Sequence, residues 1–271
     1  MDREDYADGR YEQGGAMRYL TGLAYAGMIL TGPVSSATGA EIRVLGTGAV
    51  QHSVIEAVDN FSKATGHKVV AVFGTAGAVA KRIEAGERAD VYLSSLSGIR
   101  DLQKAGHVLD EEPVSLGRVR IAVGVRKGAT KPDVGTVEKL KAVLLAAPSF
   151  AYGDPASGAT TGIHFARILQ TLGIDEEVKG RAVLRNGGLL VMKEVADGKA
   201  DLGVTQASEI LAVPGTEIAG YLPDALQLVT VYAGQLAPQP KDAEAAKAFL
   251  DFLSGTKGRE IFAHHGFDTG K

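Results

Sequence analysis

Strand signals and helix signals alternate along this chain from Glu41 onward, and this alternation limits the possible folds more than any other feature. Short apolar runs lead through loops of Gly, Ser or Thr into segments whose apolar residues recur at helical spacing. Such alternation predicts α/β architecture with mostly parallel sheets. The expected strands are residues 42–45, 68–73, 90–93, 119–125, 149–152, 182–184, 202–204 and 226–233.

The expected helices have recognisable starts and stops. Val54, Val58 and Phe61 recur at helical spacing, and Gly66 follows where a C-terminal cap belongs. Thr136 is placed to cap a helix that Pro148 ends. The other expected helices cover residues 78–85, 99–105, 165–172, 189–197, 242–253 and 256–264.

Composition excludes several classes of function. The chain has 271 residues, of which 45% are hydrophobic, enough for a core in one or two domains. Its net charge of −3 and the lack of a basic cluster argue against nucleic-acid binding. The absence of cysteine excludes disulfides, thiolate metal sites and cysteine nucleophiles. We assign the pair His264–His265 to a helix end rather than to a metal site, so neither a metal nor another cofactor is predicted.

Residues 1–40 have the pattern of an export signal. Met17 and Arg18 precede the apolar run "YLTGLAYAGMIL" and then a stretch of small residues. We predict that Met17 is the true start, that cleavage falls between Ala37 and Ala40, and that the mature protein is periplasmic. The apolar run is too short to span a membrane. An ordinary buried helix is the alternative interpretation.

The loops that follow the expected strands are rich in glycine and hydroxyl groups. The most pronounced is "YGDPASGATTGIH" at residues 152–164, and similar loops stand at 46–49, 74–77, 185–188 and 205–208. In open α/β sheets, ligands bind beyond the carboxyl ends of the strands. Helix N-termini and glycine loops expose backbone N–H groups that bind anions. These loops together therefore predict a cradle for a small anion.

Other glycine-loop functions lack their motifs. "GTGAVQ" does not complete the dinucleotide fingerprint G-x-G-x-x-G, because Gln51 stands at the third glycine's place. "GTAGAVAKR" lacks the ending of a phosphate-binding P-loop, and no G-x-S-x-G motif of an α/β-hydrolase occurs.

From about Glu41 to Phe267 the chain resembles periplasmic solute-binding proteins of the molybdate-binding type. The matching segments are "GTGAV…FSKATGHKVVAVFGTAGAVAKRIEAGERADVYLSS", "AYGDPASGATTGIHFARILQTLGI" and "EVADGKADLGVTQASEIL". The resemblance implies a type 2 periplasmic-binding-protein fold: two α/β lobes that close over a ligand cleft by hinge motion. It places lobe 1 at 41–120 plus 234–271 and lobe 2 at 121–233. It also implies a monomer that serves an ABC permease.

The resemblance also implies which residues contact the ligand, although several positions depart from the family pattern. Ala49 and Ala76 stand where molybdate binders place serines, and Gln206 where they usually place a tyrosine. Each hydroxyl lost from a buried oxyanion site costs about 1–3 kcal/mol if nothing replaces it. The ligand is therefore expected to be a small oxyanion, molybdate-like, or a small carboxylate. The expected ligand-binding residues are Thr47, Gly48, Ala49, Thr75, Ala76, Gly77, Ser157, Thr160, Thr161, Asn186, Gly187, Gly188 and Gln206.

A second resemblance leaves an enzymatic function open. The segments "DPASGATTGIHFA", "VLRNGG" and "QASEIL" are similar to a sub-branch of the same fold that includes bacterial aconitate isomerase. Such an enzyme moves an allylic proton and needs a proton carrier. The candidates are His164, Asp154 and Glu209. No acid–base pair is evident, so a binding protein is the leading hypothesis and an aconitate isomerase the alternative. A binding protein that serves a sensor kinase is a third possibility.

Overall fold

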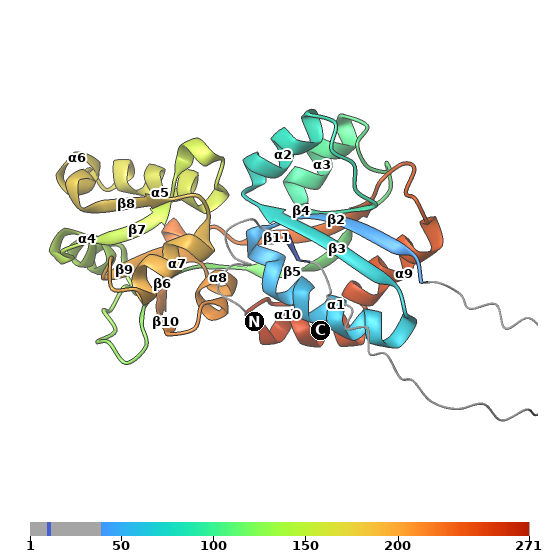
Figure 1. The fold of residues 1–271 in the computed structure, drawn as a ribbon. Helices are drawn as coiled ribbons and strands as arrows, with labels where there is room; N and C mark the ends of the chain where they lie inside the picture. The colour runs from blue at the N-terminus through green and yellow to red at the C-terminus, as the bar shows by residue number, and fades with distance from the viewer. Residues whose placement is uncertain (1–9, 12–38, 271) are drawn as a thin grey trace, which may run out of the picture.

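A computed structural model describes residues 10–11 and 39–270, and these residues form two groups of elements that lie side by side (Figure 1). The expected signal peptide, with Met17 and the cleavage region after Ala37, lies almost wholly outside the described residues. Within the part of the chain that is described, no helix combines the length and the apolar composition needed to cross a bilayer.

Lobe 1 contains a six-stranded sheet in the order β1-β3-β2-β4-β11-β5. Helices α2 and α3 lie on one face of this sheet, and α1, α9 and α10 lie on the other (Figure 1). The strands are β1 (Arg10–Tyr11), β2 (Glu41–Thr47), β3 (Lys68–Gly74), β4 (Val91–Ser95), β5 (Val114–Val119) and β11 (Thr230–Leu236). The helices are the 3-10 turn η1 (Gly48–Val50), α1 (Gln51–Thr65), α2 (Ala76–Glu84), α3 (Leu96–Lys104), α9 (Ala243–Ser254) and α10 (Thr256–His264).

Lobe 2 contains a five-stranded sheet in the order β10-β6-β9-β7-β8. Its strands are β6 (Ile121–Arg126), β7 (Phe150–Gly153), β8 (Ala182–Arg185), β9 (Leu202–Gln206) and β10 (Thr216–Tyr221). Its helices are α4 (Val137–Ala146), α5 (Thr160–Thr171), α6 (Asp175–Val178), α7 (Gly188–Ala196) and α8 (Ala207–Ala212). Three 3-10 turns complete the lobe: η2 (Pro155–Ser157), η3 (Lys179–Arg181) and η4 (Asp224–Leu226).

The predicted α/β class is confirmed, but the expectation of mostly parallel sheets is wrong. Among the described strands, four neighbouring pairs are parallel. Five pairs are antiparallel. The parallel pairs join strands connected through helices, as in ordinary βαβ units. Most of the antiparallel pairs involve β5, β6, β10 and β11. These strands lie next to the two connections between the lobes. They therefore run opposite to the neighbouring strands of their sheets.

The chain passes between the lobes twice. The strand expected at 119–125 corresponds to β6 of the lobe 2 sheet, whereas β5 of the lobe 1 sheet was not predicted apart from its last residue, Val119. Arg120 lies between the two strands. On the return, β11 pairs with β4 and β5 from Thr230 onward. We therefore propose that lobe 2 ends before Thr230 rather than after Ala233.

Each lobe has its own apolar core, and the predicted caps are confirmed. Phe61 of α1 meets Phe249 of α9 edge to face, with ring centroids 5.1 Å apart. In lobe 2, Phe165 meets Tyr152 in the same way at 5.2 Å. Gly66 ends α1 in the left-handed conformation, with φ of 76°. The Thr136 side chain accepts a hydrogen bond from the Lys139 N–H at the start of α4. These two packed cores hold the loops of the cleft in place.

Candidate ligand-binding cleft

A cleft of about 1310 Å³ lies between the lobes. On the lobe 1 side it is lined by residues that follow β2 and β3, together with Ser95 and Tyr232. On the lobe 2 side it is lined by residues that follow β7, β8 and β9. These are the loops in which the sequence predicted an anion site.

Eleven of the thirteen predicted ligand-binding residues line this cleft, and two do not. Gly77 and Ser157 lie where the two lobes touch each other rather than in the cleft lining. The residues that the structure brings together in the lining are Thr47, Gly48, Ala49, Thr75, Ala76, Thr160, Thr161, Asn186, Gly187, Gly188 and Gln206.

A close backbone contact joins the two lobes, and we call it the interlobe contact. The Thr75 hydroxyl donates a hydrogen bond to the Ser157 carbonyl at 2.6 Å. The Gly77 N–H donates to the Gly158 carbonyl at 3.3 Å. A Cβ added to Gly77 would come within 2.8 Å of the Gly158 Cα, so both positions need glycine for the lobes to approach this closely. The two lobes are therefore in direct contact at Gly77 and Gly158.

Three helices of lobe 2 begin at the cleft: α5 at Thr160, α7 at Gly188 and α8 after Gln206. Their N-cap residues make no side-chain cap. The Glu209 carboxylate accepts hydrogen bonds from the backbone of Gly188 and Gln206, so the α5 start is the one without a side-chain acceptor among these three described helices. By contrast, the Thr75 hydroxyl accepts a hydrogen bond from the Ala78 N–H at the start of α2. Uncapped first-turn N–H groups carry partial positive charge and are available to an anion. The cleft thus offers anion donors mainly from lobe 2.

The Thr47 hydroxyl is a further donor, and it comes from lobe 1. Thr47 is only 6% exposed, and its Oγ1 has no hydrogen-bond partner among the described residues. Buried hydroxyls are normally paired, because leaving one unpaired costs free energy. An unpaired hydroxyl that lines a cleft is in a position to bind a ligand.

Glu209 lies at the floor of the cleft. Its carboxylate accepts a hydrogen bond from the Thr205 hydroxyl at 2.5 Å and further bonds from the backbone of Gln206 and Gly188. The side chain is buried, and its pKa is raised because desolvation outweighs these three hydrogen bonds. A Cβ on Gly188 would lie 2.0 Å from the Glu209 carboxylate, so glycine is required at this position. Glu209 is therefore a buried acid that holds its proton more tightly than an exposed glutamate.

Gln206 and Tyr232 form a pair across the two lobes. The Tyr232 hydroxyl of β11 donates to the Gln206 Oε1 at 2.8 Å. This bond occupies the amide oxygen and leaves the Gln206 Nε2 as a donor group. Burial, with the Glu209 carboxylate nearby, raises the pKa of Tyr232. A tyrosine at position 206 would supply a hydroxyl group here; in this chain the Tyr232 side chain of β11 supplies one instead.

His52 is a cleft residue that sequence reasoning missed. It lies in the first turn of α1 and lines the cleft. Burial, with a smaller contribution from His265, lowers its pKa to about 4, so it is neutral at pH 7. Its position shortly after the glycine loop at 46–49 could have identified it as a cleft residue from the sequence.

Of the three proton carriers proposed from sequence, only Glu209 lines the cleft. The His164 ring contacts the Leu226 carbonyl through Nε2 at 2.9 Å. The Asp154 carboxylate accepts a hydrogen bond from the Ala156 N–H within the η2 turn. His164 and Asp154 therefore serve local structure within lobe 2.

The fold and the cleft define a two-lobe solute-binding protein, and comparison with known proteins identifies its family. Residues 42–268 match the family described as bacterial extracellular solute-binding protein. This match covers most of the chain, so the protein belongs to that family.

Two curated relatives carry different functions. The chain is 34% identical to aconitate isomerase from Pseudomonas sp. over 250 residues, which cover 90% of this chain and 92% of the relative. It is 24% identical to the molybdate-binding protein ModA of Escherichia coli strain K12, with coverage of 84% and 88%.

Solved structures confirm the two-lobe fold. The periplasmic molybdate-binding protein of Azotobacter vinelandii has a TM-score of 0.72 at 20% identity, covering 85% of this chain and 100% of its own. The sulfate-binding protein SubI from Mycobacterium tuberculosis has a TM-score of 0.65 at 16% identity, covering 84% and 86%. At these identities the likeness shows the fold alone.

Proposed function

We propose that the protein captures a small organic anion with two or three carboxylate groups in the interlobe cleft. After export to the periplasm it would deliver this anion to an ABC permease. The observation that carries the proposal is Glu209, a buried carboxyl group in the lining of a cleft to which hydroxyl groups and helix N-termini also contribute.

A fully deprotonated tetrahedral oxyanion fits this floor poorly. When it is ionised, Glu209 repels any anionic group placed against it. A small tetrahedral oxyanion, unlike a larger organic acid, has no uncharged part that could face Glu209 instead. Ala49 and Ala76 supply no hydroxyl to replace the serines of molybdate binders.

An organic acid with several carboxylates fits better. Its carboxylates would lie against the first-turn N–H groups of α5 and α7 and near the Thr47 hydroxyl. Its carbon skeleton, or a protonated oxygen, would face Glu209. The predicted ligand-binding residues of both lobes would then contact one molecule at once.

Thermal unfolding with a panel of anions tests this proposal. The panel contains citrate, cis-aconitate, trans-aconitate, molybdate and sulfate. A ligand present at 100 times its dissociation constant stabilises the folded protein by roughly 2.7 kcal/mol. We expect stabilisation by at least one of the carboxylates and none by sulfate. Stabilisation by molybdate alone would contradict the proposal.

Isomerisation of aconitate is the second candidate function, and the raised pKa of Glu209 favours it. A carboxylate with a raised pKa is a stronger base and remains able to return the proton at neutral pH. Glu209 would remove the allylic proton of aconitate and return it to the other end of the three-carbon system as the double bond moves. N–H groups of α5 and α7 would stabilise the negative charge that develops on the carboxylates.

Proton NMR of cis-aconitate incubated with the protein tests this activity. In an isomerase, trans-aconitate appears with time, and Glu209→Gln abolishes its formation while the substituted protein still binds ligand. His164→Gln, which changes a candidate proton carrier outside the cleft lining, is the control and retains turnover. Tight binding without turnover would reject the enzymatic function and leave solute capture standing.

A further inference from the structure

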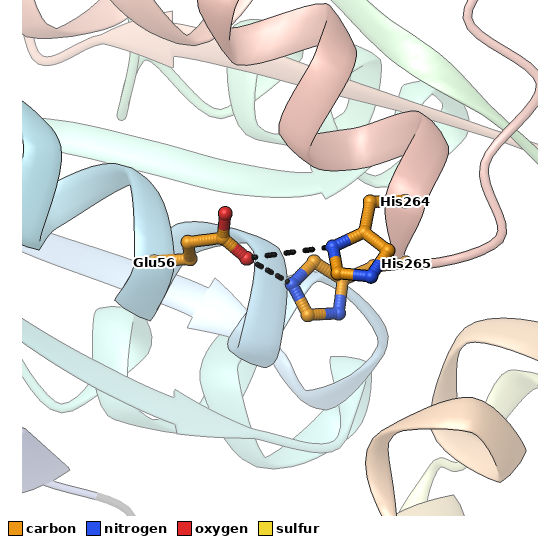
Figure 2. Close-up of side chains that lie close together, drawn as sticks. All are labelled: Glu56, His264 and His265. Carbon is orange, nitrogen blue, oxygen red and sulfur yellow. Dashed lines mark hydrogen bonds and ion pairs between the residues drawn. The ribbon is translucent and has the colours of Figure 1, made fainter.

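Two histidines and a glutamate lie together on lobe 1, outside the cleft lining (Figure 2). His264 and His265 stand at the end of α10, and Glu56 lies on α1. The Glu56 Oε2 is 2.8 Å from the His265 Nε2 and 3.9 Å from the His264 Nδ1. One ligand atom from each residue lies within 4.8 Å of the other two. The sequence predicted no metal site at His264–His265, because nothing in it shows that Glu56 lies beside them.

We propose that Glu56, His264 and His265 bind a divalent transition metal ion such as Zn²⁺. Two imidazoles and one carboxylate are a common protein ligand set for zinc, with a water at the fourth position. In a tetrahedral zinc site the ligand atoms lie about 3.4 Å apart. The two separations from the Glu56 Oε2 are 2.8 and 3.9 Å, and all three ligand atoms lie within 4.8 Å of one another, so rotation of the side chains would bring them to this spacing.

The surroundings of the three residues favour a cation. His264 is the last residue of α10 and His265 is its C-cap, where the helix dipole places partial negative charge. The His264 side chain is 78% exposed and the Glu56 side chain 41%, so a hydrated ion has direct access. The His265 side chain is 19% exposed and is packed beside α1, which limits its rotation. The site therefore has one fixed imidazole and one accessible imidazole around a carboxylate.

An ordinary ion pair between Glu56 and His265 is the competing explanation. It needs a protonated imidazole, whereas metal binding needs both imidazoles neutral. The two explanations therefore predict opposite responses to acid: acidification strengthens the ion pair and expels the metal.

Calorimetric titration with Zn²⁺ tests the proposal directly. The chain is purified without a polyhistidine tag, treated with a chelator and titrated with zinc chloride at pH 7.5 and at pH 5. A parallel titration uses magnesium chloride, because Mg²⁺ prefers oxygen ligands. We expect one Zn²⁺ per chain at pH 7.5, loss of binding at pH 5 and no binding of Mg²⁺.

Substitutions assign the binding to these residues. His264→Ala removes an exposed ligand, and Glu56→Gln removes the carboxylate charge while keeping the side-chain shape. Each is expected to weaken Zn²⁺ binding by about tenfold or more. His107→Ala, which removes a histidine outside the cluster, leaves the affinity unchanged. Circular dichroism checks that each variant is folded. Absence of Zn²⁺ binding to the unsubstituted chain, or equal affinity in His264→Ala, would overturn the proposal.

Discussion

The two walls of the cleft differ in charge. Among the described lining residues, the lobe 1 wall has no Asp, Glu, Lys or Arg, whereas the lobe 2 wall contains Lys193, Asp197 and Glu209. Lys193 and Asp197 pair with each other at 2.8 Å, which leaves Glu209 as the acidic group of the lining outside that pair. We therefore propose that lobe 2, rather than lobe 1, decides which anion is bound.

The same division appears in the hydroxyl and N–H donors. On lobe 1, Ala49 and Ala76 supply no side-chain donor to the cleft, and the Thr75 hydroxyl donates its hydrogen bond in the interlobe contact. Lobe 2 presents the helix start at Thr160, which no N-cap side chain caps, and the start at Gly188, which is bonded to Glu209. We propose on these grounds that the ligand differs from molybdate.

The largest effect is expected from paired glycine substitutions on the two walls. In Gly188→Ala, the new Cβ would lie 2.0 Å from the Glu209 carboxylate and 2.1 Å from the Thr205 hydroxyl. In Gly48→Ala it would lie 3.5 Å from Glu209, an ordinary contact. Calorimetry with the best ligand should show affinity reduced about 100-fold for Gly188→Ala, or ~2.7 kcal/mol, and nearly unchanged for Gly48→Ala. Equal losses in both variants would remove the distinction between the walls.

The next effect concerns the pH dependence that Glu209 imposes. Its raised pKa keeps it protonated to higher pH, and a bound anion favours that protonated form. Affinity should therefore fall as pH rises through the raised pKa, and Glu209→Gln should remove this fall. Comparing the two proteins between pH 5 and pH 9 cancels the titration of the ligand itself. Parallel pH profiles for the two proteins would show that Glu209 does not face the ligand.

Much of this arrangement was predictable from sequence, and the exceptions have physical causes. The glycine and hydroxyl loops identified the cleft because they end strands whose apolar runs are clear. β5 was missed because Ser115, Gly117 and Arg118 interrupt its apolar residues. β10 was missed because it is an edge strand with a bulge between Ile218 and Gly220 and weak apolar patterning.

Contacts between residues that are far apart in the chain could not be predicted from sequence patterns. Tyr232 reaches Gln206 from a strand that returns from the other lobe. Glu56 meets His265 across 209 positions of the chain. Neither contact produces a local pattern in the sequence. Glu209 was identified as a candidate proton carrier because it follows a strand that ends at the cleft.

A smaller effect is expected from the interlobe contact. Gly77→Ala would place a Cβ 2.8 Å from the Gly158 Cα and so disfavour closure. Ligand affinity should fall about tenfold, or ~1.4 kcal/mol, while the unliganded protein keeps its melting temperature. Small-angle scattering should show that saturating ligand compacts the unsubstituted chain more than the variant. Equal compaction would mean that this contact does not stabilise the closed form.

The smallest effect is expected at Thr47. Thr47→Val removes a buried hydroxyl that makes no hydrogen bond within the described protein. Folding stability should be kept or slightly raised, whereas ligand affinity should fall about fivefold, or ~1 kcal/mol. Thermal unfolding without ligand and calorimetry with ligand measure the two quantities separately. Unchanged affinity would exclude Thr47 from the ligand contacts.

The central claim is that this cleft prefers an organic carboxylate to a tetrahedral oxyanion. Calorimetric titration of trans-aconitate into the full chain at pH 7.5, with and without a large excess of molybdate, tests it most directly. We predict binding at one site per chain with an affinity that molybdate does not change. Competitive displacement of trans-aconitate by molybdate, or tight binding of molybdate alone, would contradict the claim.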